Sequence, residues 1–236
     1  MLIAVVLIAA AALCARLAFW QLARLDQKRA INERAAAALA APPIALTSAS
    51  QSARELLGRR IQASGAYDEG RQILLSGLVR EGEPGVEVLT PLLLTGGGAV
   101  LVNRGWLPAP DAVTARPEDD AEPGPRDVVG VAEPLSSGTP TPAWRALRAD
   151  SVTIWSAHGI GLDSVRTRFP YPVAGLTLRQ LPDPKLPVRP LRSAPEPVGT
   201  TMHLSYAIQW FLFAGAFVAG AIFLAVRPGP ARRASS

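Results

Sequence analysis

The sequence predicts a membrane protein in which two transmembrane α-helices flank a mainly antiparallel β domain, either a small barrel or a sandwich, with minor α-helix. Two apolar stretches predict the helices: residues 2–22 carry one charge, Arg16, and residues 204–226 carry none. At about 1.5 Å per residue, each stretch can cross the roughly 30 Å hydrocarbon core of a bilayer. Between them, short runs of alternating apolar and polar residues, separated by glycine and proline turns, are typical of β-strands.

The first apolar stretch is expected to stay as an anchor rather than to be removed as a signal peptide. The α-amino group is the only positive charge before Leu2, so the positive n-region of a signal peptide is missing. Alanine-rich helical sequence also continues beyond the stretch. We therefore predict a transmembrane helix over residues 1–22 and a helical extension over residues 23–43, ended by two consecutive prolines. The second transmembrane helix is predicted over residues 204–226.

Two spans place both termini on the same side of the membrane. The tail over residues 227–236 carries three arginines, which favours a cytoplasmic tail, but the extension after the first span is also basic. Because long loops cross membranes largely regardless of their charge, the positive-inside rule leaves the side open.

The composition argues against several classes of function. The net charge is only +5, from 24 Lys+Arg against 19 Asp+Glu, and the arginines are scattered, so no nucleic-acid partner is expected. Cys14 is the single cysteine, which rules out a disulfide within the chain and a cysteine-based metal cluster. The sequence carries no nucleophile elbow, phosphate-binding loop or metal-ligand spacing, and we expect the chain not to be an enzyme.

The β-rich domain is predicted over residues 44–180. Alternation predicts six strands, over residues 60–67, 71–80, 86–95, 99–107, 126–131 and 171–180. The three glycines at positions 96–98 predict a hairpin between the third and fourth of these, and Pro91 suggests an edge or a bulge.

Three further segments of this region have other predicted structures. A short helix is predicted over residues 143–157, with Trp144, Leu147 and Ser151 on one side. Residues 108–125 are rich in proline and acidic side chains and predict an exposed, flexible loop. Residues 181–203 hold many prolines and predict an extended linker that leads into the second span.

His203 is the residue best suited to binding chemistry. It stands at the start of the second span, and Tyr206 and Trp210 follow three and seven residues later, on the same helical face. A neutral imidazole in this place can act as an axial haem ligand, beside aromatic groups that suit a flat ring. The alternative is a helix-end histidine satisfied by water or by a carbonyl oxygen, and the residues alone leave both interpretations open.

Arg16, Trp20 and Arg24 share one face of the first helix, because they are spaced four residues apart. One interpretation adds them to a site with His203, where a cation suits a haem propionate. In the other, Arg16 simply extends its side chain to the membrane surface. Small residues in the patterns Gly215-xxx-Ala219 and Ala216-xxx-Gly220 predict close approach of the two spans.

From end to end, the chain resembles the SURF1 (Shy1) family of cytochrome c oxidase assembly factors. Four stretches carry the resemblance: Trp20-Gln21-Leu22-Ala23-Arg24 with Lys28, Gly65-Ala66-Tyr67-Asp68, Gly85-Val86 through Thr90-Pro91-Leu92 followed by Val100 to Pro108, and His203-Leu204-Ser205-Tyr206-Ala207 with Gln209-Trp210. Three features depart from the family pattern: Met202 stands where an asparagine commonly precedes the histidine, residues 108–125 have no clear counterpart, and residues 144–158 only loosely resemble the family's short helix.

The resemblance implies a location and a role. It implies a multi-pass protein of the bacterial plasma membrane, with both termini cytoplasmic and the middle domain extracytoplasmic. It also implies help in delivering or retaining haem a while the catalytic subunit I of an aa3-type haem–copper oxidase is built, with haem a synthase as a second partner. Two rival functions stay open: a scaffold that binds oxidase subunits without haem, and a membrane-anchored envelope sensor or enzyme.

The resemblance also implies which residues act. By the resemblance, His203 would bind the haem iron. Our hypothesis from the spacing along the two helices adds the residues lining that transient haem a site: Tyr206, Trp210, Trp20, Arg16 and Arg24. Asn103, Arg104 and Trp106 are candidates for contact with the partner subunit. The alternative for these three is a strand with a polar face and a core tryptophan.

Overall fold

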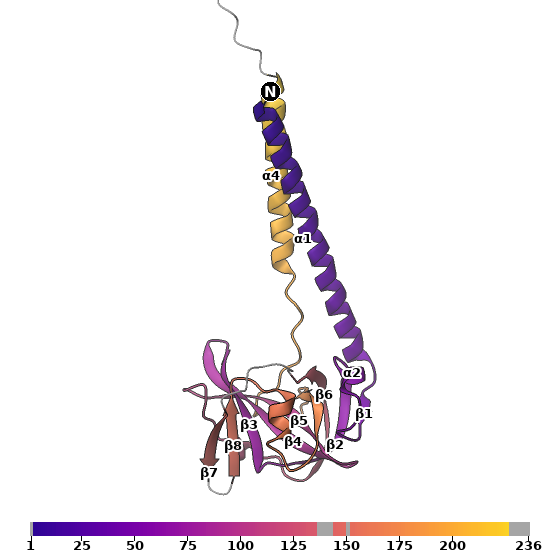
Figure 1. Cartoon of the computed structure of the whole chain (residues 1–236), viewed down its shortest axis with the longest axis vertical. Helices are drawn as coiled ribbons and strands as arrows, with labels where there is room; N and C mark the ends of the chain where they lie inside the picture. The colour runs from indigo at the N-terminus through magenta and orange to yellow at the C-terminus, as the bar shows by residue number, and fades with distance from the viewer. Residues whose placement is uncertain (1, 136–143, 150–151, 227–236) are drawn as a thin grey trace, which may run out of the picture. The chain divides into compact units, whose positions relative to one another are not determined.

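The computed structural model describes residues 2–135, 144–149 and 152–226, and the chain forms two compact units. One unit comprises Met1–Ala35 and Pro197–Ser236 and contains most of the two long helices, and the other comprises Ala36–Glu196 and contains the sheet (Figure 1). The predicted fold class is confirmed, because two apolar helices flank a domain that is mostly β-sheet.

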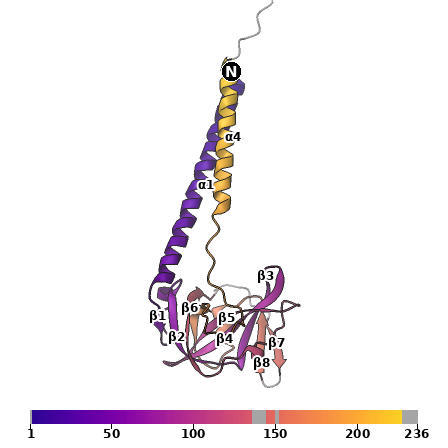
Figure 2. The ribbon, with the colours of Figure 1, turned by 180° about the vertical axis from the view of Figure 1, so that it is seen from behind.

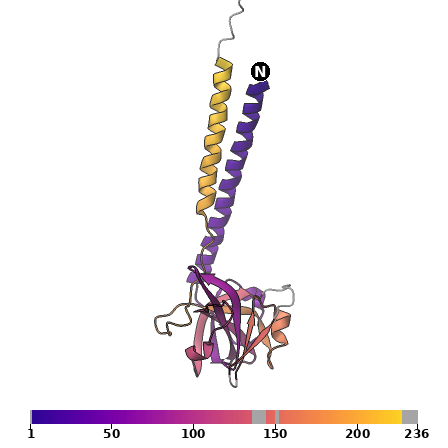
Figure 3. The ribbon, with the colours of Figure 1, turned by 90° about the vertical axis from the view of Figure 1, so that its left-hand side faces the viewer.

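The helical unit is built from α1 (Leu2–Ala40) and α4 (Thr201–Val226), which run side by side in opposite directions (Figure 3). By length and composition, both are apolar enough to span a membrane. α1 continues without a break through the predicted span and its extension, and it ends before Pro42, whose ring cannot continue a helix.

The two helices pack along a seam of positions that recur every three or four residues, as in an antiparallel coiled coil. Many of the seam residues are small, and Ala18 and Ala207 are 0% and 1% exposed, so the backbones approach closely. The seam comprises Leu7, Ala11, Cys14, Ala18, Gln21, Leu25, Lys28 and Asn32 of α1, and His203, Ala207, Trp210, Ala214, Phe217 and Ala221 of α4.

Most of the small residues that were expected to mediate this packing lie outside the seam. A Cβ at Gly220 would lie 3.5 Å from Leu7 Cδ1, so this position does face α1. Gly215, Ala216 and Ala219 are exposed, which corrects the predicted packing face. The seam follows the three-and-four spacing of buried residues rather than the small-xxx-small pattern.

The second unit contains a small closed barrel. Its strands follow one another around the barrel as β2 (Arg60–Tyr67), β6 (Pro125–Pro134), β9 (Val173–Gln180), β5 (Ala99–Pro108) and β4 (Glu83–Leu94). The barrel closes where the end of β2 pairs antiparallel with the end of β4, joining Gly65 to Leu94 and Tyr67 to Leu92. The barrel core is therefore lined by inward-facing aliphatic residues of these five strands.

Further strands extend the sheet beyond the barrel. β3 (Arg71–Arg80) pairs with β4, and on its other side β8 (Val152–Ala157) and then β7 (Arg145–Ala149) complete that edge (Figure 2). At the opposite edge, β1 (Ile44–Leu46) pairs with β2. The short helices are α2 (Ala53–Leu56), the 3-10 helix η1 (Pro117–Asp120) and α3 (Leu162–Arg166).

The helix predicted over residues 143–157 is wrong. The described part of this segment forms the antiparallel hairpin β7–β8, in which Leu147 pairs with Ile154; Ala143 and Ser151 lie outside the described residues. The residues Val152-Thr153-Ile154-Trp155 are β-branched or aromatic and favour a strand, and their parallel pairing with β3 stabilises it.

Pro91 lies inside β4, where the partner of that strand changes. Up to Leu89, one side of β4 pairs with β3, and from Leu92 the same side pairs with β2. Proline has no N–H to donate, so it fits the point at which neither partner requires one. The irregularity predicted from this proline is therefore the place where the barrel separates from the outer strands.

Candidate functional site

His203 lies in the first turn of α4 and is joined to α1 by a hydrogen bond. Its Nδ1 is 2.7 Å from Oε1 of Gln21. An amide oxygen only accepts hydrogen bonds, so Nδ1 is the donor, and in the neutral imidazole the lone pair then lies on Nε2. Nε2 has no hydrogen-bond partner among the described residues, and an imidazole nitrogen in this state can bind a metal ion.

The residues predicted around His203 take different positions. Trp210 is half-buried in the seam, two turns further along α4, and its ring meets that of Phe213 edge-on at 5.9 Å. Tyr206 is 44% exposed on the outside of the pair. The structure thus places one of these two aromatic groups in the seam and leaves the other accessible from outside.

Of the three residues predicted on α1, two are brought together. The guanidinium of Arg24 lies over the ring of Trp20, 5.7 Å from its centroid, and Trp20 is 52% exposed. Arg16 is exposed and makes no hydrogen bond or ion pair within the described part of the chain. All three lie on the outer surface of the pair and not in the seam with His203.

Gln21 is the residue that reasoning from sequence missed. In the sequence it is part of the Trp20-Gln21 motif, but the spacing of Arg16, Trp20 and Arg24 points to a different face of α1. The signal that points to it is the spacing of Ala11, Cys14 and Ala18 with Gln21, which continues the seam of α1 toward the start of α4.

Two more polar residues of the α1 seam hold the chain that leads into α4. Lys28 Nζ donates to the carbonyl of Gly199 at 3.0 Å. Asn32 bonds both backbone groups of Val198, donating to the carbonyl at 2.9 Å and accepting from the N–H at 2.8 Å. Together with Gln21 they fix where α4 begins against α1.

The barrel unit contains a buried cluster of charges around Arg104. This side chain is fully buried and forms a 2.8 Å ion pair with Glu122, which is 4% exposed. Arg192 bonds the same oxygen of Glu122, and Arg126 bonds the other at 2.5 Å. Three guanidiniums thus surround one carboxylate, which we call the Glu122 cluster.

The electrostatics of the Glu122 cluster depend on the arginines. Burial alone would raise the pKa of Glu122, but the guanidiniums of Arg104, Arg192 and Arg126 outweigh it and hold that pKa below its ordinary value. The ring of Tyr67 lies under Arg104 at 5.1 Å and Arg126 at 4.9 Å, and burial raises the pKa of its hydroxyl. The cluster keeps its carboxylate charged and its phenol neutral.

The three residues predicted to contact a partner have structural roles. Arg104 belongs to the buried Glu122 cluster and is fully buried in this chain. Asn103 is 5% exposed and donates to Glu87 at 2.8 Å. Trp106 is half-buried against Gly85, where a Cβ would come within 2.3 Å of its ring, and its backbone pairs with Leu191.

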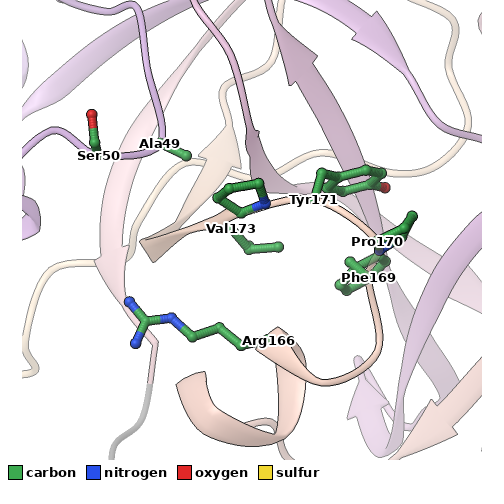
Figure 4. Close-up of a pocket in the computed structure, with 8 residues that line it drawn as sticks. Ala49, Ser50, Arg166, Phe169, Pro170, Tyr171 and Val173 are labelled. Carbon is green, nitrogen blue, oxygen red and sulfur yellow. The ribbon is translucent and has the colours of Figure 1, made fainter.

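A surface hollow of about 570 Å³ lies beside α3 (Figure 4). Arg166 extends along one side of it, Ser50 lies on another, and Phe169 and Tyr171 lie together at the far end. Arg166 is the only charged group among its lining residues, and none of them was singled out from the sequence. Within the described residues, no group of three or more His, Cys, Asp or Glu side chains is placed to hold a metal ion.

Comparison with known proteins gives the family. The model of the SURF1 family matches residues 8–215, which include most of α1, the barrel and the first part of α4. The chain belongs to the SURF1 family. SURF1-like proteins of Mycobacterium bovis and of two strains of Mycobacterium tuberculosis, all described as uncharacterised, are 34% identical to it over 110 residues.

These SURF1-like relatives match only part of the chain. The aligned region covers 44% of this chain and 41% of each relative, so the match spans about two fifths of the relatives' length. The SURF1 family match, by contrast, extends from the first helix past His203 to residue 215.

Proposed function

We propose that this chain is an assembly factor, not an enzyme, for an aa3-type haem–copper cytochrome c oxidase. In this proposal it receives or retains haem a, as cargo, while the catalytic subunit I is built, and haem a synthase is the source of that cargo. Membership of the SURF1 family supports the role in oxidase assembly. The haem-binding part rests on the residues of this chain.

The observation that carries the haem-binding part is the hydrogen bond between His203 and Gln21. Its Nδ1–H is engaged by Gln21 at 2.7 Å, which leaves Nε2 as the nitrogen for the haem iron. The exposed ring of Trp20 and the guanidinium of Arg24 lie on the outer surface of α1. An aromatic ring suits a flat macrocycle, and a cation suits a propionate.

The proposal includes a topology. The two helices that are apolar enough to span a membrane would place both termini in the cytoplasm and the barrel outside it, in the bacterial plasma membrane. His203 then lies near the outer membrane surface, because it begins the helix that returns to the cytoplasm. A haem delivered within the bilayer can then reach His203 without entering the barrel.

A deletion strain tests the proposed function. We expect membranes from cells that lack this chain to have reduced a-type oxidase absorbance and reduced cytochrome c oxidase activity, both restored by the wild-type gene but not by His203→Ala. Normal absorbance in the deletion strain would contradict a role in assembly. Full restoration by His203→Ala would contradict haem binding and favour the scaffold.

A further inference from the structure

Gln21 and His203 are 182 residues apart in sequence, yet they form the polar contact of the helix seam nearest the start of α4. Gln21 is half-buried and flanked along its own face by Ala18 and Leu25, which are 0% and 3% exposed. Opposite, Ala207 is 1% exposed. This packing leaves the glutamine side chain little freedom, so its amide oxygen is held in one place.

A neutral imidazole carries one proton on either of its two nitrogens, and the hydrogen bond decides which. Because the partner atom is an amide oxygen, the proton resides on Nδ1. Metal-binding histidines commonly donate their second N–H to a carbonyl or carboxylate oxygen, which fixes the tautomer, orients the ring and raises its basicity. The Gln21 contact has this chemistry.

Resting on the proposed function, we propose that Gln21 is a positioning residue for haem binding: it holds His203 so that Nε2 is presented to the iron. The backbone bonds of Lys28 and Asn32 to Gly199 and Val198 support the same geometry, because they fix the segment just before α4. Gln21 itself does not touch the haem in this proposal. It acts through the imidazole.

The test uses the purified full chain in detergent, titrated with haemin. We expect Gln21→Met, which keeps the length of the side chain but removes the acceptor, to bind haemin 10–100-fold more weakly, the usual effect of losing such a supporting partner. Gln21→Glu keeps an acceptor and should restore the affinity. Gln209→Met is the matched control, since Gln209 is exposed on α4 and has no hydrogen bond within the described residues.

A vibrational readout separates positioning from simple loss of structure. In the reduced complex, the iron–imidazole stretching frequency should fall in Gln21→Met, rise in Gln21→Glu and stay unchanged in Gln209→Met, because the basicity of the ring follows its Nδ1 partner. Wild-type affinity and frequency in Gln21→Met, with binding abolished in His203→Ala, would overturn the positioning role and leave the proposed function intact. Wild-type binding in His203→Ala would instead overturn the haem-ligand proposal.

Discussion

Glu122 shows how far a single residue can depart from what its neighbourhood in the sequence suggests. It comes from the acidic, proline-rich stretch expected to be exposed, yet it is buried under Arg104, Arg126 and Arg192. Its backbone N–H also donates to Glu69 at 2.6 Å. Removing the carboxylate would leave three buried or half-buried guanidiniums without their shared partner.

Glu122→Gln is therefore expected to lower the free energy of unfolding of the barrel by about 3–5 kcal/mol, the usual cost of breaking a buried ion pair from one side. This loss of unfolding free energy is measured by urea titration of the full chain in detergent, followed by tryptophan fluorescence. Asp119→Asn is the control, because Asp119 is 62% exposed and pairs with the exposed Arg116; its effect should stay below about 0.5 kcal/mol. Equal effects of the two substitutions would contradict the assigned role.

The same carboxylate predicts a dependence on pH. The pKa of Glu122 is lowered in the folded chain, so its stabilising contribution is present above the ordinary glutamate value of 4.5 and is lost as the pH falls through the folded-state pKa. The difference in stability between the wild type and Glu122→Gln should be largest at neutral pH and shrink below about pH 4.5. A stability difference that is independent of pH would show that the negative charge of Glu122 does not stabilise the fold.

At the residue scale, the sequence shows which side chains are chemically capable, but not which residues they contact in the fold. His203 stands out because it is one of only two histidines and begins an apolar helix. Gln21 cannot be paired with it from sequence, since the rotation of α1 about its axis decides whether Gln21 or Trp20 meets α4. The Glu122 cluster is hidden for the same reason, because its arginines come from segments up to 88 residues apart.

At the scale of elements, barrel closure depends on a close backbone approach. β2 pairs with β6 along its length, and its last residues also pair with β4. A Cβ on Gly65 would lie 2.0 Å from the carbonyl oxygen of Leu93, so only glycine fits there. This explains why the Gly65-Ala66-Tyr67 stretch begins with glycine.

Gly65→Ala should force β2 and β4 apart and lower the free energy of unfolding by about 1–3 kcal/mol or more, as overpacking of a filled site does. Urea unfolding of the full chain in detergent checks this. In the control Gly175→Ala, in β9, the added Cβ meets nothing closer than 3.6 Å, and we expect no loss of stability. A Gly65→Ala barrel as stable as the wild type would contradict the account of the closure.

Individual strands were predictable, while their arrangement was not. β2 and β3 begin and end where the sequence predicts, because each has a clear turn at its end. β2 alternates between buried and half-buried residues, whereas β3 is buried on both faces at Ile73 and Leu74. The β7–β8 hairpin was mistaken for a helix, since Trp144 and Leu147 also fit helical spacing. The parallel pairings of β3 with β8 and β5 with β9 join distant segments and leave no local signal.

At the scale of the whole molecule, the proposed function requires that the barrel lie outside the cytoplasm. Cys14 is the only cysteine and is buried in the seam, so Cys14→Ser gives a background for labelling. With Glu83→Cys at the exposed start of β4, a membrane-impermeant maleimide should label intact spheroplasts. With Ser235→Cys in the same background, labelling is expected only after lysis. The reverse pattern would contradict the topology.

The pigment carried by the purified full chain tests the central claim most directly. When purified from cells that make haem a, the wild type and His158→Ala should carry a-type haem, and His203→Ala should not. His158 is the matched control, because it is the other histidine of the chain and is hydrogen-bonded to Ser76 in the barrel unit. Equal haem in all three proteins, or loss only in His158→Ala, would contradict haem binding by His203.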